Sequence, residues 1–223
     1  MSNKFTLLTF LSLCIIGSSG CVIKVGGAEQ EGNVSSIFGP LEVSEGKTVK
    51  DVSSVNGGVE LGDHVQAQRI ESVNGTILVG DFVSVYSIHT VNGHIKAGHN
   101  LRVSQDIRTV NGSVNIKSDS LVSRDIETIN GDITLDDVTV GGNIETRSGI
   151  VSLSNHTQVT GDIVFHTQNK DAWNWAGEQN IPQLTIDIGS TVQGRIILER
   201  EVKLNFVAPE LQARVIRRYQ ALQ

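Results

Sequence analysis

The sequence predicts an all-β fold, a three-sided single-stranded β-helix with about 18 residues per coil and a C-terminal capping helix. A motif recurs every 18 or 19 residues, and the composition favours tight turns between short strands. The 223 residues include 23 Gly but only 3 Pro, 6 Phe, 2 Tyr and 2 Trp, which predicts a narrow aliphatic core. We expect right-handed winding, although the sequence itself leaves the hand open.

The repeat is the motif [S/T]-[V/I]-N-G-x-[V/I]-x-aliphatic, with complete copies starting at residues 54, 72, 90, 109 and 128. Degenerate copies precede and follow them. The shared glycine column is Gly39, Gly57, Gly75, Gly93, Gly112, Gly131 and Gly149. A unit of this length is too short for a propeller blade or a helix pair, but it suits one coil of a β-helix.

Three columns of the repeat define the inside and outside of one strand. An aliphatic column consists of Val52, Ile70, Ile88, Ile107, Ile126, Ile144 and Ile163. Two residues later comes a hydroxyl column of Ser54, Ser72, Thr90, Thr109, Thr128 and Thr146. The position between them is polar, in Ser53, Glu71, His89, Arg108, Glu127 and Glu145. Because side chains alternate along a strand, we expect the first two columns inside and the third in solvent.

An asparagine column precedes the glycines and comprises Asn56, Asn74, Asn92, Asn111 and Asn130. Asn and Gly both tolerate positive φ, so each Asn-Gly pair predicts a sharp corner. Stacked Asn side chains can also hydrogen-bond along the rod axis. A ligand-binding stripe is the functional alternative, but we favour a structural corner ladder because such bends require these residues anyway.

The column before the asparagines is apolar and allows two interpretations. It contains Val55, Val73, Val91, Val110 and Ile129, which strict alternation would place outside. Either the backbone kinks at the corner and turns these residues inward, or the rod displays an apolar stripe. We expect the kink. The stripe would imply lateral self-association or a docked partner.

The first twenty residues have the order of a secretory signal peptide. Lys4 supplies the positive charge, and residues 5–16 are apolar but too short to cross a bilayer comfortably. The following Gly-Ser-Ser-Gly ends at Cys21 and resembles the lipobox of bacterial lipoproteins, except that Ser18 replaces the usual aliphatic residue. The resemblance implies cleavage before Cys21 and its modification with lipid, palmitate included. Val22 in place of Asp favours sorting to the outer membrane.

The ends of the solenoid follow from where the repeat stops. We expect a flexible tether over residues 21–35, the solenoid over 36–207 and a helix over 208–223. The helix would begin near Pro209 and cover the last coil with one apolar face, made of Leu211, Val215, Ile216, Tyr219 and Leu222. A loop insertion at about 168–181 carries Trp173 and Trp175, which either bind a partner or sugar ring or fold back over the rod.

Several function classes receive no support from the sequence. A net charge of −6 with scattered basic residues argues against nucleic-acid binding. No catalytic or cofactor motif appears, so we expect neither enzyme activity nor a cofactor. His89, His94 and His99 recur every five residues, but three ligands on different strands and bends rarely converge on one metal. A calcium site among Asp132, Asp136 and Asp137 is a remote enzyme-related alternative.

The SVNG repeats resemble the adhesin-like β-helical repeat family of bacteria over about residues 35–165. Residues 189–196 are also similar in rhythm to bactofilins, the polymer-forming cytoskeletal β-helices. Together with the lipoprotein signal, the first resemblance leads us to expect a non-enzymatic, envelope-anchored structural or adhesin-like module that presents a β-face to a protein or glycan partner. The second implies a self-assembling scaffold. Members of that family usually lack a cleaved lipoprotein signal, whereas this chain is predicted to have one.

Overall fold

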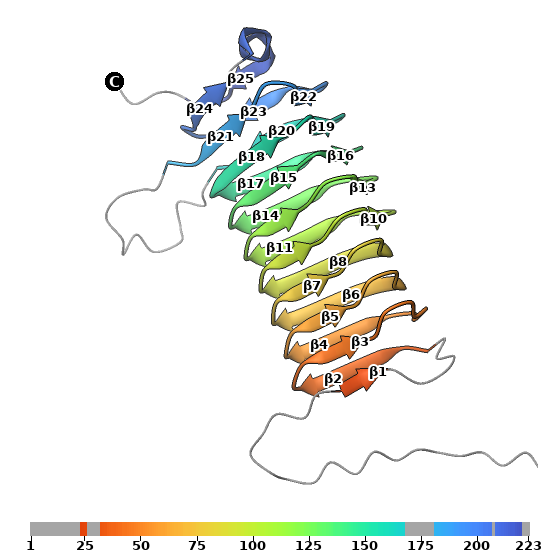
Figure 1. The fold of residues 1–223 in the computed structure, drawn as a ribbon. Coiled ribbons are helices and arrows are strands. Elements are labelled where there is room, and N and C mark those ends of the chain that lie inside the picture. Colours follow the sequence, from red (N-terminus) through yellow and green to blue (C-terminus); the bar gives the residue numbers. More distant parts are fainter. Residues whose placement is uncertain (1–22, 26–31, 168–180, 207, 220–223) are drawn as a thin grey trace, which may run out of the picture.

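The computed structural model describes residues 23–25, 32–167, 181–206 and 208–219. Strands account for 56% of the structure, and they form a parallel β-solenoid of about nine turns with about 18 residues in each (Figure 1). This confirms the predicted fold class. Every coil pairs in register with the next, so equivalent residues of successive repeats lie side by side.

The rod has three sides, and one sheet forms the first of them. Its strands are β1 (Ile23–Val25), β3 (Leu41–Val43), β5 (Val59–Leu61), β7 (Ile77–Val79), β9 (Ile95–Ala97), β12 (Val114–Ile116), β15 (Ile133–Asp136), β18 (Ile150–Ser154), β21 (Gln183–Ile186) and β24 (Lys203–Phe206). These strands pair in that order, each with the equivalent strand of the neighbouring coil.

A second sheet folds around a corner and supplies the other two sides. The second side contains β10 (Arg102–Val103), β13 (Ser120–Val122), β16 (Val138–Val140), β19 (Gln158–Val159) and β22 (Thr191–Val192). The third side contains β2 (Val34–Phe38), β4 (Val52–Asn56), β11 (Ile107–Asn111), β14 (Ile126–Asn130), β17 (Ile144–Ser148), β20 (Ile163–Phe165), β23 (Ile196–Leu198) and β25 (Val215–Arg217). Two longer strands, β6 (Gln66–Asn74) and β8 (Ser84–Asn92), continue around the corner.

The core is the stack of inward columns. Every member of the aliphatic column from Val52 to Ile163 has no exposed surface, and the hydroxyl column beside it is buried. The polar column between them is exposed or half-buried. The expected alternation is therefore confirmed. Stacked aliphatic rungs remove each coil's apolar surface from water, and burial of this kind is the main stabilising contribution to folding.

The coil length changes from 18 to 19 residues partway along the rod. Val85 and Ile88 lie in one continuous strand with two residues between them. Their partners in the next coil, Val103 and Ile107, have three residues between them and belong to separate strands. The extra residue thus enters at the corner between the second and third sides. A longer step follows later, since Ile163 pairs with Ile196; the coil resumes in register after the predicted insertion.

The predicted C-terminal α-helix is wrong. Residues Pro209–Arg214 form a short 3-10 helix, and β25 then pairs with β23, with Val215 opposite Ile196. The apolar spacing suited a helix, but it equally suits one more coil, in which β-branched residues favour a strand. Leu211 is buried against the core. Leu222 lies outside the described residues.

The solenoid also begins earlier than expected. Within the segment predicted to be a tether, Ile23–Val25 forms β1 and pairs with Leu41–Val43. Strand β2 begins at Val34, before the predicted boundary at residue 36. The parallel ladder therefore includes parts of residues 21–35 that composition alone assigned to a linker.

Candidate functional site on the third side

The five asparagines of the repeat form one hydrogen-bonded ladder along an edge of the third side. Each side-chain Nδ2 donates to Oδ1 of the asparagine one coil earlier, at 3.0 Å for Asn74 to Asn56 and 2.9 Å for the three later pairs. Ser148 ends the ladder by donating to Asn130 at 3.0 Å. All five asparagines are solvent-exposed. We call this row the asparagine edge.

The glycines beside the asparagine edge are required by close packing rather than by positive φ. A Cβ atom on Gly93 would lie 2.0 Å from the carbonyl oxygen of Gly75, and one on Gly112 would lie 1.9 Å from that of Gly93. Among the described residues, positive φ in the glycine column occurs only at Gly39 and Gly149. The corner predicted at the Asn-Gly pairs is present, but the prediction that positive φ explains it was wrong.

Left-handed residues occur instead at the corner between the first and second sides. His64, Phe82 and Asn100 occupy equivalent positions there with φ of 58°, 58° and 56°. The His64 and Phe82 rings stack with their centroids 5.0 Å apart. A bulky residue such as Phe82 rarely adopts positive φ, so residue type at this position did not predict the corner.

The buried hydroxyl column secures the carbonyls of the glycine column. Thr128 Oγ1 donates to the carbonyl oxygen of Gly112 at 3.1 Å, and equivalent bonds occur in neighbouring coils. Ser54 differs, since its buried Oγ has no hydrogen-bond partner. The equivalent carbonyl, that of Gly39, accepts from Ser36 instead at 3.2 Å.

The column beside the asparagine edge faces outward, so the expected kink is wrong. Val55, Val73 and Val91 are each 41% exposed, and Val110 and Ile129 are partly exposed. The reason is that the strand remains extended past the hydroxyl column, so alternation holds as far as the valine, and only the asparagine that ends the strand departs from it by being exposed as well. Ile37, 66% exposed, extends this row. We call these six residues the apolar column.

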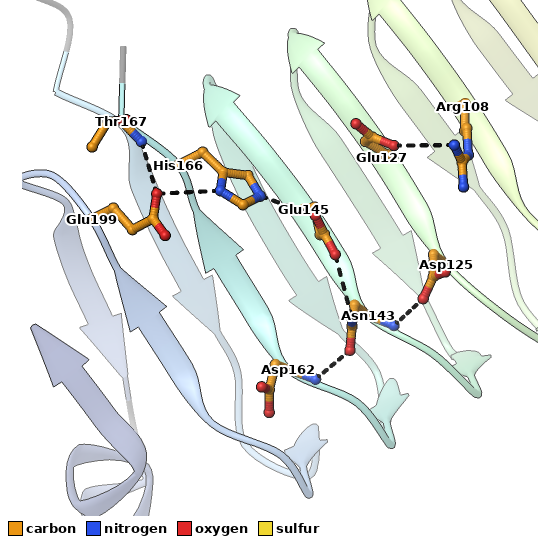
Figure 2. Close-up of polar contacts among 9 residues, drawn as sticks. All are labelled: Arg108, Asp125, Glu127, Asn143, Glu145, Asp162, His166, Thr167 and Glu199. Atoms are coloured by element: carbon orange, nitrogen blue, oxygen red, sulfur yellow. Dashed lines mark hydrogen bonds and ion pairs between the residues drawn. The ribbon is translucent and has the colours of Figure 1, made fainter. Parts of the chain in front are cut away.

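In later coils charged residues such as His166 and Glu199 occupy the same outward column, and Glu145 reaches His166 from the neighbouring polar column. His166 Nε2 lies 2.9 Å from Glu145 Oε2, and its Nδ1 lies 3.3 Å from Glu199 Oε2, so the imidazole bridges three coils (Figure 2). Burial disfavours the charged imidazole, but the two carboxylates outweigh it and raise the pKa of His166 above 6.5. We call these three residues the ionic rungs.

A second ionic group lies earlier on the third side. Asp106 contacts both Arg108 and His89, the latter at 3.3 Å. Arg108 also reaches Glu127 at 3.7 Å (Figure 2). Burial opposes ionisation of Asp106, but its contacts with the Arg108 guanidinium and the His89 imidazole prevail and lower its pKa. His89, Arg108 and Glu127 belong to the outward polar column that the sequence predicted, and Asp106 reaches the first two from the corner directly before Ile107.

Side chains at the corner before the aliphatic column form a ladder that sequence reasoning missed. Asp125 accepts from the backbone N–H of Asn143 at 2.8 Å, and Asn143 from that of Asp162 at 2.9 Å (Figure 2). Asp162 accepts in turn from the backbone N–H of Arg195 at 2.7 Å. The Arg195 guanidinium and backbone N–H lower the pKa of Asp162. The same 18- to 19-residue spacing could have revealed this column, because each member directly precedes an aliphatic residue.

The metal-ligand alternatives do not converge on one point. His94 Nδ1 accepts from the backbone N–H of Ser113 at 3.0 Å, and His99 Nδ1 lies 2.8 Å from Ser118 Oγ, while His89 contacts Asp106. Asp132 accepts from the backbone N–H of Ile150, and Asp136 accepts from the side-chain Nδ2 of Asn155. Within the described ranges, no group of three His, Cys, Asp or Glu side chains could hold a metal ion.

Three predicted site residues lie outside the part of the chain that the structure describes: Cys21, Trp173 and Trp175. No helix among the described residues is both long and apolar enough to span a membrane.

A depression of about 240 Å³ lies on the second side near the N-terminal end. It is lined by Thr48, Val49, Lys50, Gln66, Ala67 and Gln68. None of these six is a carboxylate, so the depression lacks the acid and base pair that glycoside hydrolysis requires.

Comparisons with protein-family models, curated proteins and solved structures find no match to this chain.

Proposed function

We propose that this chain is a non-enzymatic lipoprotein of the bacterial envelope, anchored through Cys21, that presents the third side of its solenoid to a partner. The observation that carries the proposal is the outward surface of six successive coils. There the exposed apolar column runs beside the asparagine edge on a hydrogen-bonded frame. An exposed apolar stripe bordered by polar residues is typical of a surface that another molecule covers.

A structural or adhesin-like role suits this surface better than catalysis. Binding across a flat face needs complementary area rather than a cleft, and the regular spacing of the columns supplies a long, uniform surface. The depression on the second side has no carboxylate in its lining, which favours a binding role over glycan cleavage.

The anchor is tested by metabolic labelling of the full chain with an alkyne fatty acid in a bacterial host. Wild type should carry the label and sediment with outer membranes, whereas Cys21→Ala should lose both properties. Cys14→Ala is the matched control and should behave as wild type, because Cys14 precedes the expected cleavage site. Unlabelled wild type, or equal labelling of Cys21→Ala, would refute the lipoprotein assignment.

Display of the third side is tested separately, with both variants in the anchored chain. Val91→Lys places a charge in the apolar column, and Leu78→Lys places one at a comparably exposed residue of the first side, where Leu78 is 40% exposed. In crosslinking of intact envelopes, the Val91 variant should lose the chain's crosslinked partners and the Leu78 variant should keep them. Loss in both variants, or in neither, would contradict the choice of surface.

A further inference from the structure

We infer that the partner of the apolar column is a second copy of this chain, with the two rods antiparallel and their third sides face to face. This inference rests on the proposed function in one respect, which is that both use the third side as the displayed surface. The first argument is spacing. The apolar column repeats once per coil, at the roughly 4.8 Å separation of neighbouring strands. Another copy presents apolar side chains at the same interval, so the two columns can pack along their whole length.

The charges at the end of the column select the antiparallel arrangement. In a parallel pair with apolar columns in contact, Arg147, His166 and Glu199 would each face their own copies, because they continue the same column. Like charges held together in this way are unfavourable. In an antiparallel pair centred between Val73 and Val91, the six apolar coils overlap and the charged coils extend beyond the partner into water.

The antiparallel register also matches the remaining columns. A two-fold axis along the strand direction keeps each column opposite itself and reverses the order of coils. Glu71 then faces His89, and Ser53 faces Arg108, so no like charges meet in the polar column. Asn74 faces Asn92, and both are exposed amides that can donate and accept.

The size of the surface predicts a modest affinity. Six coils at about 4.8 Å and a five-residue strand of about 17 Å give a face of roughly 500 Å² per copy. A pair would bury about 1,000 Å² in total, near the lower limit for specific interfaces. We therefore expect exchange between monomer and pair, with the pair favoured where anchoring concentrates the chain. Two anchors about six coils apart would lay the pair along the membrane.

The test uses two differently tagged full-length chains expressed together, one with Ile37→Cys and the other with Ile129→Cys, which face each other in the antiparallel register. A short thiol-to-thiol crosslinker is added after lysis, so the result does not require lipidation or an oxidising compartment. We expect a crosslinked product carrying both tags. Chains with the same substitution, Ile37 with Ile37 or Ile129 with Ile129, hold their cysteines five coils or about 24 Å apart and should give about tenfold less product. Wild type corrects for crosslinking through Cys14 and Cys21.

A second pair of variants shows whether the apolar column holds the copies together. Val55→Lys in both chains should lower the mixed product about tenfold, while Leu78→Lys on the first side should leave it unchanged. Preferential same-site products, equal products in all combinations, or none would overturn the inference. Fatty-acid labelling of the same samples shows separately whether the proposed lipoprotein assignment has failed.

Discussion

The third side of the rod is built in two ways along its length. Up to Asn130 its outward column is apolar, and amide hydrogen bonds link its edge. Beyond that point the same column holds charged residues, and His166 links neighbouring coils through Glu145 and Glu199. The inward aliphatic column does not change between the two regions. The buried aliphatic column therefore determines the coil in both regions, and the two regions differ in the surface that the third side presents to solvent or to a partner.

The largest expected effect tests the close packing of the glycine column beside the asparagine edge. Gly93→Ala places a methyl group where 2.0 Å separates it from a backbone oxygen, so coils must move apart. We expect a loss of more than about 3 kcal/mol in the free energy of unfolding, measured by urea denaturation. Gly32→Ala is the control, because no atom lies within 4 Å of its added Cβ. Equal stability of the two variants would show that the glycine column is dispensable.

A smaller effect distinguishes satisfied from unsatisfied hydroxyls within one buried column. Thr128→Val keeps the side-chain shape but removes the donor to the Gly112 carbonyl, which should cost about 1–2 kcal/mol. Ser54→Ala removes a hydroxyl that has no partner and should change stability by less than about 0.5 kcal/mol. Thermal unfolding of the two variants gives the comparison. A larger loss for Ser54→Ala would contradict the role assigned to these hydroxyls.

The asparagine edge should contribute less per residue because it is exposed. Asn92→Ala removes one donated and one accepted amide bond, and we expect a loss of about 1 kcal/mol. Asn115→Ala, at an exposed position of β12, should change stability by less than about 0.5 kcal/mol. If both variants match wild type in denaturant titration, the ladder has no stabilising role.

The smallest effect belongs to the ionic rungs. Because the pKa of His166 is raised in the folded chain, its contribution to stability is fully present below about pH 6.5 and is lost as pH rises through the folded value. Its partly exposed position limits this to less than about 0.5 kcal/mol. NMR titration should place the pKa of His166 above 6.5, and Glu199→Gln should lower it. An unchanged pKa in that variant would exclude Glu199 as a cause.

Much of the fold could be predicted because aligning the repeats reveals columns of one residue type. The 18-residue spacing predicted the length of the coil, and the polar residue between the Ile and Thr columns identified the inner face. Spacing could not distinguish a last coil from a helix, since Leu211 and Val215 satisfy both patterns. Only pairing does so, because Val215 lies opposite Ile196.

The candidate surface was harder to predict than the core. Placing Val55 and its equivalents required knowing where the chain turns, and Asn-Gly pairs are compatible with a bend on either side of the asparagine. The ionic rungs were also hidden, because His166 and Glu199 are 33 residues apart and become neighbours only across the insertion.

The extra residue at the corner after Val103 shows where the solenoid tolerates a change in chain length. The two-residue link between Val85 and Ile88 lies against the three-residue link between Val103 and Ile107, yet Val103 still pairs with Val85 and Ile107 with Ile88. The added residue is therefore absorbed at the corner, and the inward columns on both sides of it stay in register. The same residue added within a strand would turn every following side chain of that strand to the opposite face. Length variation between coils is thus compatible with an unbroken core only at such corners.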